Sequence, residues 1–547
     1  MNEYISVSYN KIQIHNRVGF LSFEEEIFLR EILSKQQLRH LMLIETLYYM
    51  DDWVKLSELS RKLHCSDRIL KDDIAFFRDK HTSFNIETSS YGIRIAFHEN
   101  VSIDLIHQNL LKEMVEFKIL EYIFFHENQT IDSISNIFFV SKSTLYRMIK
   151  RINRSLKKHY HIELESGPLC IAGAERDIRY FYSQYFTECY ANFEWPFETI
   201  DEPSFVEFLL AFTKILQIPM DYGTLCHIKI VTAVNFIRLT NHHWVSNRQS
   251  NNLNILKFLS KSSDFKKIAV NFQELYGFDL DLPVLEQLFV AFVQKDFHFD
   301  YSSLINQSKL DEHTKKSTNF LDCFLDQLAS SYGITLTNKE SLILDLHNTS
   351  HLEKQTIQSN YILFDKKKHF VQQLQNEYPE FFKNVYNGIK MYRKHINQES
   401  NEIVLNHLVY TLFTHWERLF FELEKRQQPI YILVISDYDR HHAEMIVEMI
   451  DLYTSNQVIV ERHTDLHLSC DSLAHSKYNI IVSSSYIGKI ENKHIIYIES
   501  LMTTKVISEI QRVVKLLKEK NLQVRNTRIG SLENKRQITE TPAASPF

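Results

Sequence analysis

Residues 140–160 read VSKSTLYRMIKRINRSLKKHY, and this stretch decides the fold of the region around it. It contains seven basic side chains and no acidic one, whereas the whole chain has a formal net charge of -6. Positive charge concentrated on one segment of an otherwise acidic protein is typical of binding to a phosphate backbone. The basic residues are Lys142, Arg147, Lys150, Arg151, Arg154, Lys157 and Lys158.

The stretch also has the pattern of a helix. Ser141 offers a hydroxyl for N-capping, and Leu145, Ile149, Ile152 and Leu156 recur at helical spacing, so that they form one apolar stripe. We therefore predict a DNA recognition helix. Its expected contacts are Lys142, Ser143, Thr144, Tyr146, Arg147, Lys150, Arg151, Arg154 and Lys157.

The flanking residues complete a winged helix-turn-helix. Residues 117–126 and 131–138 read as two helices before the turn at 139–140, and HIELESGPLCIAG reads as a two-stranded wing around the turn signal at 166–168. The alternative is a solvated basic helix followed by an ordinary hairpin. Basicity, cap, turn and wing together favour DNA binding.

The same order of elements occurs once upstream. Residues 38–50, 56–64 and 66–80 read as helices, and FNIETSSYGIRIAF reads as a strand, a turn and a strand. This first helix-turn-helix is weaker electrostatically, because five basic and four acidic residues in 62–81 leave a charge of 5 − 4 = +1 against +7. Counterion release grows with the number of neutralised phosphates, so we expect the second copy to supply most of the affinity, with Arg68 and Lys71 adding less.

Length and composition limit the remaining classes. A chain of 547 residues needs several domains, and only 10 Gly and 9 Pro against 38 Phe and 27 Tyr favour a mostly helical protein. The six cysteines are scattered singly, so we expect them to be reduced and structural; they are Cys65, Cys170, Cys189, Cys226, Cys323 and Cys470. Neither a signal layout nor a run long enough to span a membrane is visible, so we expect a cytoplasmic protein.

Amphipathic helical segments continue from the wing to residue 427, and histidines recur among them. His227 and His298 are 71 residues apart, and His347 and His415 are 68 apart, with the two pairs offset by 120 and 117. This spacing suggests a duplicated helical domain of about 120 residues. Because the chain has 26 histidines, coincidence is the competing explanation.

Two tandem winged helices, the recognition-helix start STLYRM and two helical domains with paired histidines resemble the Mga family of virulence regulators. The resemblance covers nearly the whole chain. It implies that the helical pair are phosphotransferase-system regulation domains (PRDs), whose histidines accept phosphate from the sugar phosphotransferase relay. By this resemblance Ser143, Arg147, Lys150 and Arg151 are the principal DNA contacts, His227 and His347 the best phosphorylation candidates, and His298 and His415 weaker ones.

The chemistry of these histidines leaves alternatives open. A neutral imidazole can accept a phosphoryl group near physiological pH, and the added charge can shift a dimerisation equilibrium. His227 shares a helical face with Ile230, Val231 and Val234, so an ordinary core histidine is equally compatible. His347 precedes His351 by one turn, but no third metal ligand is visible, and we expect no metal site.

From residue 428 the pattern changes to α/β, with short apolar strands IYILVIS, QVIVER, YNIIVSS and HIIYIE that predict a small parallel sheet. The family resemblance implies an enzyme-IIB-like domain. Where an active enzyme IIB would have a phosphorylated cysteine, this chain reads Ser436-Asp-Tyr-Asp-Arg, and Cys470 lacks a phosphate-cradling loop. We therefore expect a catalytically silent domain that mediates self-association, followed by a polar, disordered tail.

The expected organisation is multi-domain and mostly α, in seven parts. These are an N-terminal extension (1–35), two winged helices (36–100 and 101–174), two PRD-like domains (175–303 and 304–427), an enzyme-IIB-like α/β domain (428–520) and the tail (521–547).

The resulting hypothesis is a transcription activator of surface or virulence genes, without enzymatic activity or cofactor. Its expected partners are double-stranded promoter DNA, phosphotransferase relay proteins, RNA polymerase and a second copy of the chain. Alternatives are a PRD-containing RNA-binding antiterminator, a phosphotransferase component, and a DNA-binding regulator without phosphorylation control.

Overall fold

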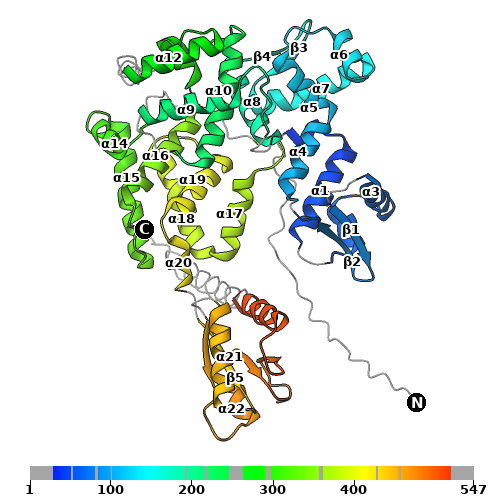
Figure 1. The fold of residues 1–547 in the computed structure, drawn as a ribbon, viewed down its shortest axis with the longest axis vertical. Coiled ribbons are helices and arrows are strands. Elements are labelled where there is room, and N and C mark those ends of the chain that lie inside the picture. Colours follow the sequence, from blue (N-terminus) through cyan, green and yellow to red (C-terminus); the bar gives the residue numbers. More distant parts are fainter. Residues whose placement is uncertain are drawn as a thin grey trace, which may run out of the picture. The chain divides into compact units, whose positions relative to one another are not determined.

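The structure is a computed structural model that describes residues 29–50, 53–80, 84–99, 101–190, 194–215, 220–245, 263–290, 297–355, 361–426, 429–454 and 458–518. These residues form two compact units, one of residues 29–326 and 338–415, the other of 327–337 and 416–518. Figure 1 shows the mostly helical build of the first unit and the small sheet of the second. The expected tail at 521–547 and most of the N-terminal extension lie outside the described residues.

The first winged helix begins with a capping box. Ser34 Oγ accepts from the backbone N–H of Gln37 (3.3 Å), and Gln37 Oε1 accepts from that of Ser34 (2.8 Å), which starts α1. A bridge between Val54 and Ile93 adds a short third strand to the antiparallel wing. The elements are α1 (Lys35–Tyr49), α2 (Leu56–Lys62), α3 (Asp67–Lys80), β1 (Phe84–Ser89) and β2 (Gly92–Phe97).

The second winged helix repeats this order after the connecting helix α4 (Ile103–Glu113). A bridge between Gln129 and Leu169 takes the place of the bridge in the first copy. The predicted order of helices and strands is thus confirmed in both copies. The elements are α5 (Val115–Phe125), α6 (Ile131–Ile137), α7 (Lys142–Tyr160), β3 (Glu163–Ser166) and β4 (Leu169–Ala172).

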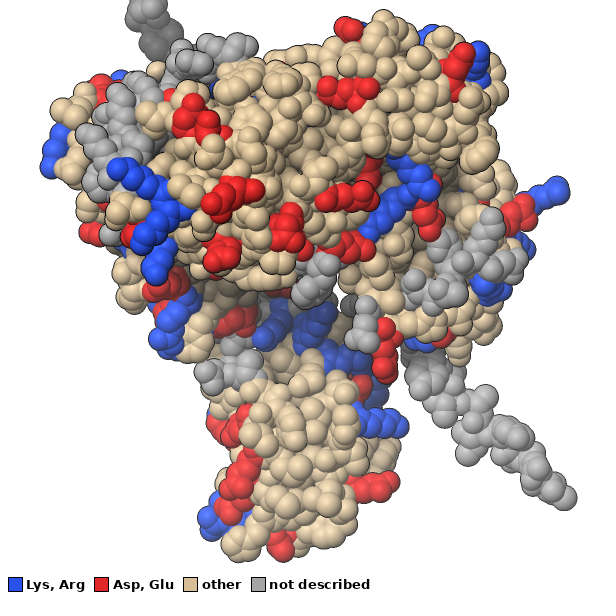
Figure 2. Space-filling model, turned by 45° about the horizontal axis from the view of Figure 1, so that its top comes forward, with Lys and Arg blue, Asp and Glu red and all other residues tan. Residues whose placement is uncertain are grey.

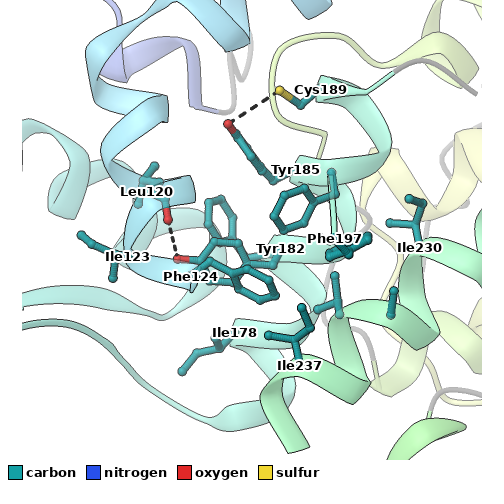
Figure 3. Close-up of a cluster of buried hydrophobic side chains, with 14 of the residues drawn as sticks. Leu120, Ile123, Phe124, Ile178, Tyr182, Tyr185, Cys189, Phe197, Ile230 and Ile237 are labelled. Carbon is teal, nitrogen blue, oxygen red and sulfur yellow. Dashed lines mark hydrogen bonds between the residues drawn. The ribbon is translucent and has the colours of Figure 1, made fainter. Parts of the chain in front are cut away.

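An aromatic core joins the second winged helix to the helical region that follows it. Figure 3 shows Leu120 and Phe124 of α5 beside Tyr182 of α8 (Glu175–Cys189), with Ile237 of α10 (Tyr222–Thr240) completing the cluster. The Tyr182 hydroxyl donates to the carbonyl of Leu120 (2.9 Å), which satisfies its only polar atom inside the core. The second winged helix and the helical region therefore share one core.

The helical region continues to residue 415, and α20 follows it as the first helix after that point in the second unit. Arg418, in the left-handed conformation (φ 59°), separates α19 from α20, so the amphipathic stretch 403–423 is two helices. The elements are α9 (Glu202–Ile215), α12 (Ser263–Tyr276), α13 (Leu282–Leu288), α14 (Tyr301–Ser308), α15 (Glu312–Tyr332), α16 (Lys339–Gln355), α17 (Lys366–Glu377), α18 (Pro379–His395), α19 (Glu402–His415) and α20 (Leu419–Glu424).

Residues 361–369, here called the strap, include the first turn of α17 and pack against the winged helices. Ile362 and Leu363 are fully buried in the same core as the second winged helix. Their backbone N–H groups donate to the two carboxyl oxygens of Glu188 in α8 (2.5 and 3.0 Å). The Leu363 carbonyl accepts from Arg30 Nε (2.6 Å). The strap thus attaches the second half of the helical region to η1, α8 and the core of the second winged helix.

Arg30 lies in the short 3-10 helix η1 (Leu29–Ile32), inside the segment expected as an N-terminal extension. The structure corrects that expectation for these residues, because Leu29 and Ile32 are fully buried against the main core. Their packing, rather than local pattern, makes them part of the fold.

The second unit is a parallel sheet, as the sequence predicts. Its strand order is β6-β5-β7-β8, and every adjacent pair is parallel. Figure 1 shows α21 (Arg440–Tyr453) alongside β5. The other elements are β5 (Ile430–Ile435), β6 (Val458–Arg462), α22 (Cys470–Ala474), β7 (Ile480–Ser483), β8 (His494–Tyr497) and a helix at 504–518.

The cysteines correct the expectation that all six are structural. All six thiols are free, but only Cys189 is fully buried, and Cys323 and Cys470 are exposed. Within the described part of the chain, no helix is long and apolar enough to cross a bilayer.

The strap generates a pH prediction. Burial raises the pKa of Glu188 to about 7, although backbone N–H groups of the strap and Lys366 act in the opposite direction. The unfolded value is about 4.3, so between these pH values the folded state binds more protons than the unfolded state, and stability falls as pH rises through this window. Glu188→Gln should flatten the dependence of Tm on pH between about 5 and 7.

Glu113→Gln, which changes an exposed carboxylate at the end of α4, is the matched control and should leave the wild-type slope in place. Equal slopes for Glu188→Gln and the wild type would contradict the role of Glu188.

Candidate DNA interface and histidine sites

Helix α7 forms because its local signals agree. The Ser141 hydroxyl accepts from the backbone N–H of Thr144 (3.2 Å), and His161 ends the helix in the left-handed conformation (φ 56°). The predicted apolar stripe of Leu145, Ile149, Ile152 and Leu156 is buried. This stripe fixes which side of α7 faces solvent.

The opposite side of α7 is polar and exposed. Ser143, Arg147, Lys150 and Arg154 follow one another at intervals of four, three and four residues, so they lie in one row. Tyr146, with 52% of its surface exposed, flanks this row. This row is here called the α7 face.

Ion pairs neutralise four of the seven basic side chains counted in the sequence. Lys142 pairs with Asp132 (2.5 Å), Lys157 with Glu163 (2.5 Å) and Lys158 with Glu31 (2.9 Å), and Arg151 pairs with Glu116. Among the residues that the structure describes, Arg147, Lys150 and Arg154 have no acidic partner. The charge available for phosphates is therefore concentrated on the α7 face.

Arg151 differs from its neighbours. Its side chain is only 33% exposed, and its partner Glu116 is 6% exposed, so the pair anchors α7 to α5. By contrast, the Lys142 and Lys157 pairs are open to water, and such pairs contribute little and can exchange a carboxylate for a phosphate. The structure thus places Arg151 in a structural contact and leaves Lys142 and Lys157 accessible to DNA.

The first helix-turn-helix has a different surface. His64 and Phe139 occupy the same left-handed turn position, 139 − 64 = 75 residues apart, with φ of 49° and 53°. Counted from this turn, the positions of Arg147, Lys150 and Arg154 correspond to Asp72, Ala75 and Asp79. Arg68 and Lys71 are exposed on α3, but they lie beside acidic positions, so α3 lacks the cationic row of α7.

Charge elsewhere is mixed. Figure 2 shows acidic and basic side chains interspersed over the face that it draws, without one broad basic surface. The second wing is itself acidic, since Glu163 and Glu165 lie on β3. Electrostatic attraction to DNA therefore depends on individual helices rather than on overall charge.

The four histidine candidates fall into two classes. His227, in the first turns of α10, is exposed, whereas the residues with which it shares a helical face, Ile230, Val231 and Val234, are buried. Partial removal from water by the surrounding protein lowers the pKa of His227, and the positive charge of Lys367 lowers it further. The imidazole is therefore neutral at physiological pH, which is the state that accepts a phosphoryl group.

His415 ends α19 with 45% of its side chain exposed. Its Nδ1 lies 2.8 Å from Asp345 Oδ2, and donation to this carboxylate leaves the lone pair on Nε2. Asp221, the N-cap of α10, interacts electrostatically with His415, so the start of α10 faces α19.

His347 and His298 are buried instead. His347 is 0% exposed, its Nδ1 is 2.8 Å from the Ser317 hydroxyl, and its ring stacks on His351 at 4.1 Å. His298 is 7% exposed, with its ring 5.6 Å from that of His347. The sequence spacing pairs His298 with His227. In the structure the ring of His298 instead contacts that of His347. In the described residues, no group of three or more His, Cys, Asp or Glu side chains could hold a metal ion.

The loop after β5 is the one where the family resemblance implies a phosphocysteine in an active enzyme IIB. The Ser436 hydroxyl is 2.9 Å from His442 Nδ1, and Asp439 caps α21 by accepting from the backbone N–H of His442 (2.8 Å). That backbone N–H lowers the pKa of Asp439, so a carboxylate already occupies the start of α21. Together with exposed Asp437, it makes this loop unfavourable for a phosphoryl group.

Sequence reasoning did not single out three features. Lys367 and His407 contact each other and interact electrostatically with His227, and Phe139 projects from the turn before α7 with 95% of its surface exposed. The basic and aromatic residue types alone do not distinguish these positions from ordinary surface or core residues.

Comparison with known proteins gives three family matches along the chain. Residues 34–90 match the M protein trans-acting positive regulator (MGA) HTH domain, 99–186 the Mga helix-turn-helix domain, and 201–419 the MGA PRD domain. The matched segments coincide with the two winged helices and the helical region of the structure.

Full-length relatives agree. A protein of Streptococcus pneumoniae named as a trans-acting regulator is 35% identical over 88% of this chain and 97% of its own length. The anthrax toxin expression trans-acting positive regulator of Bacillus anthracis is 22% identical over 87% of this chain and 98% of its own. The capsule synthesis positive regulator AcpB of the same organism is 23% identical over 64% and 73%. The chain belongs to the Mga family of DNA-binding, PRD-containing transcription regulators.

Proposed function

We propose that this protein activates transcription of surface or virulence genes by binding promoter DNA mainly through the α7 face. The observation that carries this proposal is the row of Arg147, Lys150 and Arg154, which have no acidic partner among the described residues, in contrast to the paired cations around them. Relatives named as positive regulators of toxin expression and capsule synthesis support the class of target genes.

The first test is the salt dependence of DNA binding. Replacing Arg147, Lys150 and Arg154 together by Ala should weaken binding and reduce the log–log salt slope by about 0.9 for each phosphate that the variant no longer neutralises. Replacing Arg68 and Lys71 by Ala should reduce the slope less. A gel-shift salt series on a promoter duplex measures both, and an unchanged slope in the triple variant would overturn α7 as the main reader.

A matched pair of neighbouring residues controls for unfolding. Arg151→Ala should lower the free energy of unfolding by about 2 kcal/mol, because it leaves the Glu116 carboxylate buried without its partner. Lys150→Ala should leave Tm unchanged, because Lys150 is exposed. Loss of DNA binding in Lys150→Ala without loss of stability therefore reports on the interface itself.

We further propose that phosphorylation by the sugar phosphotransferase relay modulates this activity at His227 and His415. Both side chains are exposed. Phosphoryl transfer needs a ring nitrogen with a free lone pair, which the neutral imidazole of His227 has and which the hydrogen bond to Asp345 leaves on Nε2 of His415. A phosphate on His227 would be attracted by the positive charge of Lys367, which interacts electrostatically with His227. A coupling of about 1–3 kcal/mol would change an equilibrium roughly 5–150-fold, enough for regulation.

At the two buried positions, His298 and His347, the surroundings favour an ordinary core histidine over a phosphorylated one. His347 and His298 lie in a packed polar cluster where a relay protein has no access, which supports an ordinary core role. A regulator without phosphorylation control would extend this reading to all four histidines.

Phosphate transfer from purified relay proteins and phosphoenolpyruvate distinguishes these readings. His227→Ala and His415→Ala should each remove part of an acid-labile, base-stable phosphate while leaving Tm near that of the wild type. His347→Ala should keep the phosphate but lower the free energy of unfolding by about 1–3 kcal/mol, since it breaks a buried hydrogen bond. Equal labelling of the wild type and the His227→Ala/His415→Ala double variant would contradict the proposal.

For the second unit we propose self-association rather than phosphoryl transfer. The strand order 2-1-3-4 with all strands parallel is compatible with an enzyme-IIB-like domain, but the acidic loop after β5 disfavours a phosphoryl acceptor. Ile459 on edge strand β6 and Tyr497 on edge strand β8 expose apolar surface suited to a partner copy. A homodimer would present paired α7 faces to promoter DNA and to RNA polymerase.

A further inference from the structure

The two adjacent phenylalanines of the second helix-turn-helix have opposite environments. Phe138 packs edge-on against Tyr122, with ring centroids 5.8 Å apart. Phe139 has 95% of its surface exposed. Phe139 is also one of the few residues other than glycine with a positive φ, 53°, in the described part of the chain. Its side chain therefore contributes almost no buried surface, and its backbone adopts a conformation that phenylalanine rarely takes.

The backbone conformation belongs to the fold. In both copies the residue after the turn donates its N–H to a carbonyl five residues earlier, Cys65 to Ser60 and Val140 to Ser135, each at 3.0 Å. The residue directly before each donor, His64 in the first copy and Phe139 in the second, has a left-handed backbone conformation. The helix-turn-helix thus requires this conformation twice, and Gly or Asn would meet the requirement at lower strain. Folding therefore explains the conformation but not the phenylalanine.

The position of Phe139 points to its ligand. It lies two residues before Ser141, the N-cap of α7, and therefore beside the N-terminal end of α7, where the α7 face begins. Ser143, Tyr146 and Arg147 follow on the first turns, all exposed. In helix-turn-helix proteins the N-terminal part of the recognition helix enters the major groove, where apolar side chains contact the thymine methyl group.

We propose that Phe139 is a specificity-determining residue that contacts a thymine methyl group in the major groove beside the α7 face. This inference rests on the proposed function of α7 as the main DNA reader. The occupant is DNA rather than a protein partner because the α7 face that follows Phe139 carries Arg147 and Lys150, exposed cations without acidic partners among the described residues. An apolar contact of this kind adds sequence preference without neutralising a phosphate.

The test uses the full-length protein and a duplex selected by it from a random pool. Phe139→Asn should have a Tm equal to or above that of the wild type, because Asn tolerates the left-handed region. Its affinity for the selected duplex should fall about tenfold, while the log–log salt slope stays that of the wild type. Leu310→Asn, which removes an equally exposed apolar side chain (84%) between α14 and α15, should change neither quantity.

Replacing single thymines of the duplex by deoxyuridine locates the contact. At one position this removal of a methyl group should weaken the wild type about tenfold and leave Phe139→Asn unaffected, since the two changes remove the same interaction. Equal effects of every deoxyuridine on both proteins would overturn the thymine contact. So would normal DNA affinity of Phe139→Asn combined with a defect in activation in a transcription assay, which would assign Phe139 to a protein partner.

The salt-slope experiment separates this inference from the proposed function. If the Arg147, Lys150 and Arg154 variant loses binding but Phe139→Asn keeps wild-type affinity, α7 remains the reader and Phe139 does not touch the bases. If neither change affects binding, the assignment of α7 itself falls.

Discussion

The buried carboxylate of Glu45 is the constraint on which the first unit depends. It is 1% exposed and receives Arg30 from η1 (2.6 and 2.8 Å) and His107 from α4 (2.9 Å). Burial raises its pKa, but these partners outweigh burial and hold the pKa of Glu45 below its usual range. A buried charge is tolerated only when its partners stay in place, so η1 and α4 are both tied to α1.

Through η1 this constraint reaches the recognition helix and the helical region. Arg30 also donates to the carbonyl of Leu363 in the strap, and Glu31 pairs with Lys158 near the end of α7. The short helix η1 therefore touches the first winged helix, the recognition helix of the second and the strap that leads to α17. The DNA-binding part cannot shift against this neighbourhood without breaking a buried charge network.

For the phosphorylation proposed at His227, this arrangement offers a route to the DNA-binding part. Lys367, beside His227, lies in the strap close to Leu363 and in the first turn of the helix that the strap positions. A change of charge at His227 would act on Lys367 and hence on a segment bonded to Glu188 and Arg30. The route is short and made of directed contacts, which suits a switch between two discrete arrangements.

The four histidines show that sequence spacing can select candidate positions, whereas only the surrounding structure determines whether a side chain is accessible. The sequence marks four positions by spacing alone, yet tertiary structure makes two accessible and encloses two among Ser317, His351 and their neighbours. Helical periodicity placed His227 on the apolar face of Ile230, Val231 and Val234, but the residues of α10 are buried only from Ile228 onward. Local pattern cannot tell where along a helix a partner surface ends.

What the sequence determined by itself is local: the bounds of α7 from its Ser141 cap and apolar stripe, the wing from its turn signal, and the change from helices to parallel strands after residue 428. Only the tertiary structure decided which charges on α7 remain for DNA. Glu31 is 127 residues from Lys158, and Glu116 is 35 from Arg151. Caps and stripes depend on neighbours within a few residues, whereas ion pairing and burial depend on segments that folding brings together from far along the chain.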